Sequence, residues 1–355
     1  MSNNGLSGKF WPAYSKPQED ELLSSWLVRL AMAHGLKLHT FSSLAWPHKH
    51  IWNRDIDKSA DESLLHVLSE KTPVPLDRVR DTTLSTYEGV LYERHNPFGN
   101  KFWIMPVSVY HCIRRNFGLQ FCPYCLAEDK EPYFRRRWRL AFVVVCLQHK
   151  VGLRDRCPRC GEPVNFHRDE LGFRRKLVVT SMTLCHLCKF DFRKLATEME
   201  FENTQAETRE VEIQEKLSDA MSKGWAAING REAVYSHLYF RVLHQLMRIL
   251  ATGRQSRDLR AALSAKCGLP LFTPVFTRYS RDIERLDVCA RRGLLMLAWH
   301  LLENWPQRFV EFYKENRVWS STLLRDMRGV PFWYWNGIQA HLYRISSEPR
   351  RRLRL

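Results

Sequence analysis

Cysteine and histidine pairs in the middle of the chain have the types and spacing of metal ligands. Two residues separate the members of each pair, so one tight turn can direct both side chains toward a common point. Thiolates and imidazole bind Zn2+ tetrahedrally, and two pairs supply the four ligands of one ion with no position left for water. We therefore expect two structural Zn2+ ions and no catalytic metal. The candidate ligands are Cys122, Cys125, Cys146, His149, Cys157, Cys160, Cys185 and Cys188.

The spacing alone does not decide which pairs share an ion. Sequential pairing joins the first pair with the second and the third with the fourth, and it is the simpler arrangement. Interleaved pairing, first with third, stays open. Lys189 follows Cys188 where a zinc knuckle often has glycine, so we expect a distorted turn there. Cys112, Cys267 and Cys289 stand outside the pairs and are expected to be core thiols.

A dense group of arginines around Trp138 lies between the first two pairs, in the segment 134-FRRRWRL. Contact with phosphates, combined with stacking on the tryptophan, would make this segment a nucleic-acid-binding edge. Alternatively, the arginines pair with Glu128, Asp129 and Glu131 and belong to a solvated loop. Both interpretations remain open. The candidate nucleic-acid contacts are Arg135, Arg136, Arg137 and Arg139.

The net charge is consistent with a polyanionic partner. The chain of 355 residues has 55 Lys and Arg against 38 Asp and Glu, and its pI is near 9.6. Nucleic acid and acidic membrane faces are the usual partners of such an excess. We expect no membrane span, because no apolar run approaches the roughly 18–20 residues needed. The polar N-terminus does not resemble a signal peptide, so we expect a cytoplasmic, reducing setting that favours metal binding over disulfides.

The elements that would hold these residues fall into three regions, with expected domains at 1–100, 101–204 and 205–355. Residues 18–46 predict two helices separated by a turn at Gly35, the outline of a helix-turn-helix. The second of these helices has no Arg or Lys and offers Ser42 and Ser43, so it suits protein docking or dimerisation better than base reading. One face of the first helix carries Leu22, Leu23, Trp26, Leu27, Leu30 and Ala31.

The remaining pattern predicts a mainly α fold with a small zinc-bound centre that contains β-structure. The run 140-LAFVVVCL in the tandem zinc-finger region reads as a buried strand. We expect the C-terminal region to be helical and to resemble helix-turn-helix units. Helices are expected at 61–71, 75–84, 210–228, 235–252, 256–266, 282–304, 306–316, 320–328 and 332–346.

Several motifs together resemble the TniQ/TnsD family of transposon target-selection proteins. They are ELLSSWLVRLAMAHGL, YEGVLYERH, FCPYC, an apolar strand ending in C-x-x-H, and RCPRCGEPV. The resemblance covers roughly residues 11–200. It implies two zinc fingers, with Cys122, Cys125, Cys146 and His149 in the first and the remaining four cysteine ligands in the second.

The resemblance also implies a function, that of a non-enzymatic adaptor in DNA transposition and integration. Such an adaptor links a target-recognition element to an AAA+ regulator of the TnsC type and to the transposase. The target element is attachment-site DNA or an RNA-guided CRISPR effector complex, on which shorter members dock as homodimers. The modest helical C-terminal region favours the CRISPR-coupled branch.

Two other classes of function compete with the adaptor. The alternative to the adaptor is a zinc-containing helix-turn-helix transcription regulator that binds DNA directly. An enzyme such as a nuclease is disfavoured, because the sequence has no carboxylate cluster with metal-binding spacing and no glycine-rich phosphate loop.

Overall fold

Helices dominate the computed structural model, which describes residues 6, 8–110, 113–168, 181–197, 208–228, 232–276 and 281–342. Sheet structure in these ranges is confined to three antiparallel pairs of short strands. The expectation of a mainly helical fold with few strands is confirmed. Every helix in the described ranges is too short or too polar to cross a bilayer.

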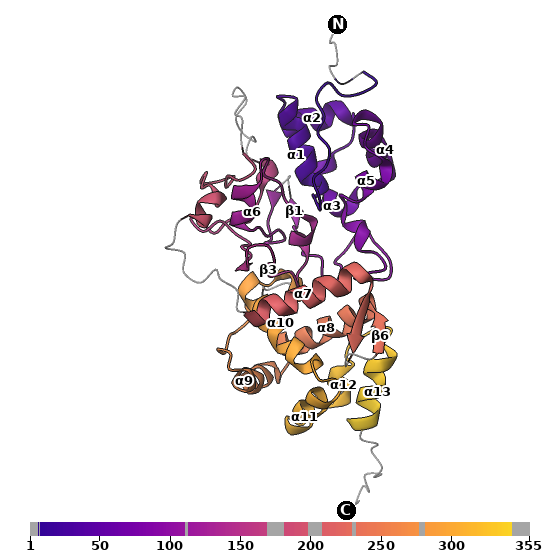
Figure 1. The fold of residues 1–355 in the computed structure, drawn as a ribbon, viewed down its shortest axis with the longest axis vertical. Helices are drawn as coiled ribbons and strands as arrows, with labels where there is room; N and C mark the ends of the chain where they lie inside the picture. Colours follow the sequence, from indigo (N-terminus) through magenta and orange to yellow (C-terminus); the bar gives the residue numbers. More distant parts are fainter. Residues whose placement is uncertain are drawn as a thin grey trace, which may run out of the picture.

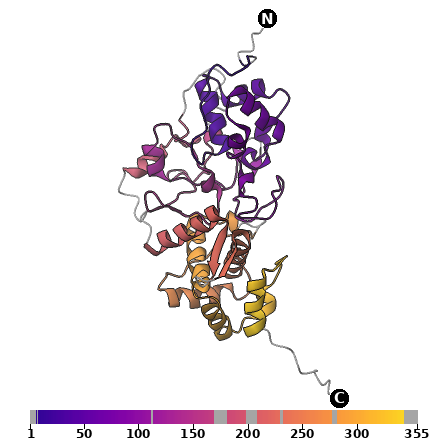
Figure 2. The ribbon, with the colours of Figure 1, turned by 45° about the vertical axis from the view of Figure 1, so that its right-hand side comes forward.

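The N-terminal helices gather at one end of the elongated molecule and the C-terminal helices at the other, as the two views in Figures 1 and 2 agree. Helix α1 forms the centre of the N-terminal group, and its residues from Leu23 to Ala31 are all buried. The group consists of α1 (Leu23–Ala33), α2 (Leu38–Ala45), η1 (Ile51–Asn53), α3 (Ile56–Ser59), α4 (Glu62–Lys71), α5 (Leu76–Arg80) and η2 (Leu84–Tyr87).

Helix α1 ends at the glycine that the sequence indicated. Gly35 has a φ of 62°, a conformation that glycine adopts without steric cost. The Gly35 amide donates to the carbonyl of Met32, and the Leu36 amide donates to that of Ala31, which is the Schellman arrangement. The turn lets α2 pack back against α1. A helix-turn-helix function for this pair stays a prediction.

The two serines of α2 have different environments. Ser43 is exposed, and its hydroxyl donates to the carbonyl of His39 at 2.9 Å. Ser42 is buried; its hydroxyl donates to the carbonyl of Leu38 and accepts from the Trp52 indole, each at 2.8 Å. The expectation that both serines face a partner is therefore wrong for Ser42, which belongs to the core.

Short elements joined by irregular backbone form the middle of the chain. The predicted strand over 140–147 is real only at its end, in β3. The preceding residues are buried as expected, but their amides donate to separate partners and not to one neighbouring strand. The Ala141 amide donates to the Trp103 carbonyl, and the Val144 amide donates to the Gln214 side chain. The elements are β1 (Val109–Tyr110), β2 (Ile113–Arg114), α6 (Pro123–Glu128), η3 (Arg136–Arg139), β3 (Val145–Cys146), β4 (Val151–Gly152), η4 (Phe166–Arg168) and η5 (Phe192–Ala196).

The C-terminal group is built around the apolar helices α8 and α10, which pack together. The helix predicted over 210–228 ends at Lys223, where Gly224 has a φ of 74° and the chain turns into β5. The helix predicted from 282 begins at Val288. The elements are α7 (Thr208–Lys223), β5 (Trp225–Ile228), β6 (Glu232–Tyr235), α8 (Ser236–Ala251), α9 (Ser256–Cys267), η6 (Ile283–Arg285), α10 (Val288–Leu302), α11 (Gln307–Glu315), α12 (Ser320–Leu323) and α13 (Phe332–His341).

A buried charge network joins the N-terminal helices to the middle of the chain. The Arg139 guanidinium is 0% exposed; it donates to Asp55 at 2.6 and 3.0 Å and to Asp57 at 3.0 Å. Asp57 also accepts from the amide and hydroxyl of Ser24 in α1. Burial raises the pKa of both carboxyls, but Arg139 reverses this for Asp55, whose pKa is lowered. Removal of the arginine alone, or of the carboxylates alone, would leave a buried charge without its partner.

A second buried arginine joins the C-terminal group to the middle of the chain. Arg291 of α10 donates to the carbonyl of Ala141 at 2.7 Å and to the Gln120 side chain at 3.1 Å. Burial lowers its pKa to about 10, which leaves it charged at neutral pH. The Asp155 carboxylate accepts from the Val288 amide at 2.9 Å and so caps α10. The three regions thus share buried polar contacts, while domain boundaries at 100/101 and 204/205 stay predictions.

We expect Arg139→Met to lower the free energy of unfolding by about 3–5 kcal/mol, because it removes the main counter-charge of Asp55 and leaves the buried Asp57 with Arg114 alone, at 3.5 Å. Lys223→Met is the control: it removes an exposed pair with Asp219 at 2.7 Å and should cost less than about 1 kcal/mol. Urea unfolding followed by circular dichroism measures both. Equal stabilities of the two variants would contradict the role given to this network.

Candidate metal centres

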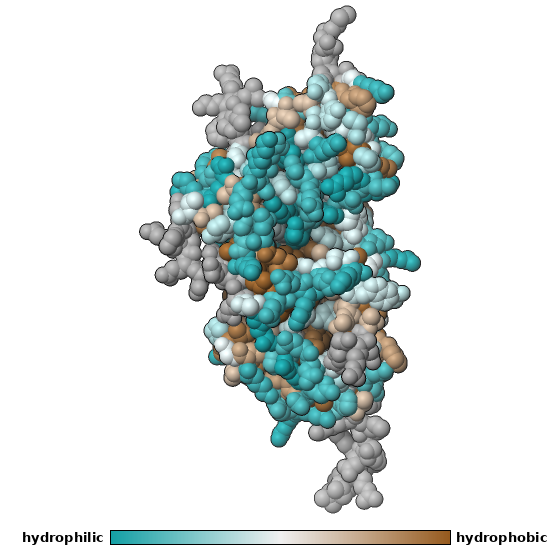
Figure 3. All heavy atoms as spheres, in the orientation of Figure 1, coloured by the Kyte–Doolittle hydropathy of each residue, from teal (hydrophilic) through white to brown (hydrophobic). Residues whose placement is uncertain are grey.

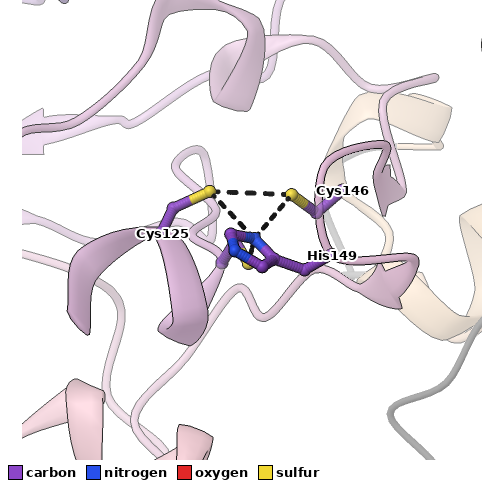
Figure 4. Close-up of side chains that lie close together, drawn as sticks. Cys125, Cys146 and His149 are labelled. Carbon is purple, nitrogen blue, oxygen red and sulfur yellow. Dashed lines mark hydrogen bonds between the residues drawn. The ribbon is translucent and has the colours of Figure 1, made fainter. Parts of the chain in front are cut away.

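The first centre brings four ligand atoms from two turns to one point. Cys122 precedes α6 and Cys125 lies in it, while Cys146 ends β3 and His149 follows in the turn to β4. The four ligand atoms lie within 4.8 Å of one another. Figure 4 shows Cys125, Cys146 and His149 directed toward a common centre. The sequence-predicted ligands of this set are therefore together.

The distances between these atoms fit a tetrahedral zinc ion. Bond lengths of about 2.3 Å to sulfur and about 2.05 Å to nitrogen give tetrahedron edges of about 3.8 Å (S to S) and about 3.6 Å (S to N). The Cys125 and Cys146 sulfurs are 3.6 Å apart, and His149 Nδ1 lies 3.4–3.5 Å from the three sulfurs. Three thiolates and one imidazole are a donor set typical of structural zinc.

The His149 ring is oriented from outside the ligand set. Its Nε2 lies 2.9 Å from the Glu128 carboxylate, which leaves Nδ1 directed at the sulfurs. The Tyr124 ring stacks on the imidazole, with centroids 5.5 Å apart. A carboxylate partner of this kind fixes the tautomer of a metal-bound histidine and increases its basicity. Sequence reasoning did not assign Glu128 this role, although it lies at the end of α6, which carries Cys125.

The second centre has four cysteine ligands. Cys157 and Cys160 meet Cys185 and Cys188 with all four sulfurs within 4.8 Å. The Cys157–Cys188 and Cys160–Cys185 sulfur distances are 3.5 and 3.6 Å, again close to a tetrahedron edge. Pairing of the knuckles in the two centres is sequential, as the simpler interpretation predicted, and not interleaved. Each centre could hold one metal ion.

Three of the four knuckles share one turn. In every knuckle the amide of the residue after the second ligand donates to the carbonyl of the first ligand; in the first knuckle this bond runs from Leu126 to Cys122, at 3.2 Å, within α6. In the three that share the turn, the bonds run from Lys150 to Cys146, from Gly161 to Cys157 and from Lys189 to Cys185, at 2.7–3.0 Å. All three donor residues have positive φ, between 52° and 74°. The turn at Lys189 is therefore not distorted, contrary to expectation; lysine adopts the glycine-like conformation at a cost of about 1–2 kcal/mol.

A cation is needed if every thiol of the first centre is to ionise. Hydrogen bonds with Cys125 and Cys146 raise the pKa of Cys122 far above its ordinary value, whereas hydrogen bonds from Cys122 and Cys125 lower that of Cys146. Like charges this close disfavour ionisation of all three thiols at once. A bound divalent ion supplies the positive charge that stabilises all the thiolates together.

Arg139 does not lie on the surface proposed for nucleic acid. It is fully buried and paired with Asp55 and Asp57, so an external phosphate cannot reach it in this conformation. This corrects the placement of Arg139 with the other three arginines. The reason is that its carboxylate partners lie more than 80 residues away in the sequence.

The other three arginines have carboxylate partners as well. Arg135 pairs with Asp129 at 2.8 Å, as the solvated-loop interpretation anticipated, although its side chain is mostly buried. Arg136 and Arg137 share Asp20, at 3.2 and 2.7 Å. Only Arg137, with 48% of its side chain exposed, is largely open to solvent. Nucleic-acid binding by this cluster stays a prediction.

A cavity of about 430 Å³ is lined by residues of η3, β3 and α7. It is lined by Arg135, Arg136 and Arg137 on one side and by Gln214 and Met221 on the other. Figure 3 shows hydrophobic side chains gathered above α7 on an otherwise mostly hydrophilic face. The arginines therefore border a partly apolar hollow beside the first metal centre.

The unpaired cysteines are not the core thiols that were expected. Cys289 is exposed and Cys267 is half-buried, so neither belongs to the fully buried interior. Cys112 lies outside the described residues.

Comparison with known protein families gives one match, and it falls on this part of the molecule. Residues 12–153 match the TniQ family model. The chain therefore contains a TniQ domain. The matched TniQ segment contains the N-terminal helices, the arginine cluster and the whole first metal centre, whereas the second centre follows it. No curated protein matches the chain.

We expect the purified protein to carry two zinc ions per chain, measured by elemental analysis of protein prepared without chelators. Cys122→Ser and Cys157→Ser should each lower the zinc content by about one ion and destabilise the middle of the chain, because structural zinc contributes folding free energy. Cys289→Ser is the matched control and should retain both ions. Wild-type zinc content and thermal stability in all three variants would contradict the ligand assignment.

Proposed function

We propose that this protein is a non-enzymatic target-selection adaptor in DNA transposition. Its TniQ domain implies a role in the selection of transposition targets. The proposal adds that the chain links a target-recognition element to an AAA+ ATPase of the TnsC type and, through it, to the transposase. The single observation that carries the proposal is the TniQ match over residues 12–153, which contains all four ligands of the first metal centre.

The chemistry of the two metal sites supports a structural role for them and not a catalytic one. Each candidate centre offers four protein ligands, and with all four bound a tetrahedral zinc has no position for water or substrate. We propose that both ions are Zn2+ and structural, and that the centres are tandem zinc fingers. Their role would be to keep the middle of the chain folded, and with it the relative placement of the two helical groups.

The target-recognition element is either an RNA-guided CRISPR effector complex or attachment-site DNA. The basic charge of the chain supports a nucleic-acid or ribonucleoprotein partner. Among the candidate arginines, Arg137 offers the most accessible guanidinium, and Arg136 borders the same hollow. We place any phosphate contact of this cluster on these two residues.

The exposed side of α2 is our proposed docking or dimer surface. Thr40 and Ser43 are its exposed residues, and the helix has no Arg or Lys. A helix that reads bases normally presents Arg, Lys, Asn or Gln to the major groove. A partner protein, or a second copy of the chain in a homodimer, fits the composition of this surface better than DNA does.

We expect deletion of the gene to abolish targeted insertion while leaving the transposase active. The measurement is the distribution of insertion sites in cells that carry the transposon and the neighbouring ATPase and transposase genes. Affinity purification of the tagged protein should recover the ATPase, together with the CRISPR complex if the target is guide-directed. An unchanged distribution of insertion sites in the deletion strain would overturn the adaptor proposal.

We expect Ser43→Glu to impair recovery of the partner or of the dimer without changing DNA binding by the isolated protein, because it places a charge on the proposed docking surface. Ser256→Glu in α9 is the control, since the Ser256 hydroxyl also donates to a backbone carbonyl, at 3.0 Å, and Ser256 does not line the hollow of Arg136 and Arg137. Pull-down yield and electrophoretic mobility shift provide the two readouts. If Ser43→Glu loses DNA binding and still assembles normally, α2 reads DNA and the docking assignment fails.

A further inference from the structure

A second cavity, of about 450 Å³, lies where the TniQ segment meets the C-terminal helices. Its walls come from residues 91–103, from α8, and from the loops around 281–284 and 326–328. This volume falls within the range of about 300–1,000 Å³ that is usual for small-ligand sites, and domain junctions are common places for them. Neither metal centre contributes to it.

The lining of the cavity has an excess of positive charge: five cations (Lys101, Arg241, Arg248, Arg281 and Arg328) against three carboxylates (Asp282, Glu284 and Asp326). Lys101, Arg281 and Arg328 line it, and none of the three forms a salt bridge with a described carboxylate. Two further lining arginines are paired: Arg241 with Glu93 at 2.7 Å and Arg248 with Asp326 at 3.1 Å. Like charges gathered around one cavity repel each other, so an anionic occupant would be stabilised there.

The aromatic ring of Phe102, packed on one face against another ring, lies among these cations. Phe102 is 54% exposed, and its ring stacks on that of His244 with centroids 4.3 Å apart and planes 25° apart. His244 is only 5% exposed and is held by the Glu284 carboxylate, 2.8 Å from its Nε2. The same carboxylate accepts from the Trp103 amide at 2.8 Å. One side of Phe102 is thus covered by a fixed ring, and the rest of it lines the cavity.

We propose that this cavity binds a nucleotide unit, with the base stacked on Phe102 and the phosphate held by Arg281, Arg328 and Lys101. A planar ring beside guanidinium groups is the combination that binds single-stranded nucleic acid. An intact duplex would keep its bases stacked on each other and out of reach of Phe102. The occupant is therefore an unpaired nucleotide of a nucleic acid strand or a free nucleotide, which share this chemistry.

The stacking contact is tested with the full-length protein and a fluorescent, mixed-sequence, single-stranded oligonucleotide, followed by anisotropy. Phe102→Ala should weaken binding about fivefold or more, and Phe102→Tyr should restore it. Phe98→Ala is the control, because Phe98 is 59% exposed but does not line the cavity. An otherwise identical oligonucleotide with abasic sites should bind weakly to the wild type and should not distinguish Phe102→Ala from it.

The phosphate contact is tested with the double variant Arg281→Gln and Arg328→Gln. It should reduce the slope of log affinity against log salt by about 1.4, the loss of two contacts to a single strand. The charge-matched control is Arg254→Gln with Arg257→Gln, which removes two exposed arginines away from the cavity. The control should leave the slope closer to that of the wild type.

Competition with ATP separates the two sources of the ligand. Displacement of the oligonucleotide by ATP at micromolar concentration, lost in Phe102→Ala, would support a free-nucleotide site. Binding of the oligonucleotide without displacement would support a site for a strand. Equal effects of Phe102→Ala and Phe98→Ala, or equal salt slopes for the two double variants, would overturn the proposal. Because these assays use the isolated protein, their outcome is independent of the insertion-site experiment that tests the adaptor proposal.

Discussion

Metal-ligand geometry is the constraint on which the middle of this protein depends. Between Cys122 and Cys188 the described chain has only helical turns and two short strands, β3 and β4, so regular hydrogen-bond ladders contribute little. Two sets of four ligands, each within 4.8 Å, close this irregular backbone into compact units. Small units with little regular structure commonly need such cross-links to fold.

The metal-bound middle in turn positions the two helical groups through buried arginines. Arg139 bonds to Asp55 and Asp57 at the start of α3, and Arg291 of α10 bonds to Gln120 and Ala141. Phe121 and Arg154 bond to each other through both amides, which ties the first knuckle to the strand leaving the first centre. Mostly buried contacts therefore join the middle of the chain to both helical groups.

The metal centres could be predicted from the sequence because their information is local. A two-residue spacing, a tight turn and a fixed coordination number define each site, and the clusters assemble in the predicted pairing. The C-terminal end of α1 at Gly35 and the burial of 140–146 could also be predicted from short patterns. The buried ion-pair role of Arg139 could not be predicted. Its partners, Asp55 and Asp57, come from a distant segment, and nothing near Arg139 in the sequence indicates them. For the same reason Asp20 was not foreseen as the shared partner of Arg136 and Arg137, and neither was the cavity beneath Phe102.

Hydrogen exchange measured by mass spectrometry, before and after zinc removal with a chelator, tests the central role of the metal centres most directly. The account predicts that metal removal exposes the amides of Phe121, Arg154 and Cys185, and that the loss of protection spreads to the start of α10 through Asp155 and Val288. The interior of α8, which contacts neither centre, should keep its protection longest. Unchanged exchange across residues 121–192 after complete metal removal would contradict the account.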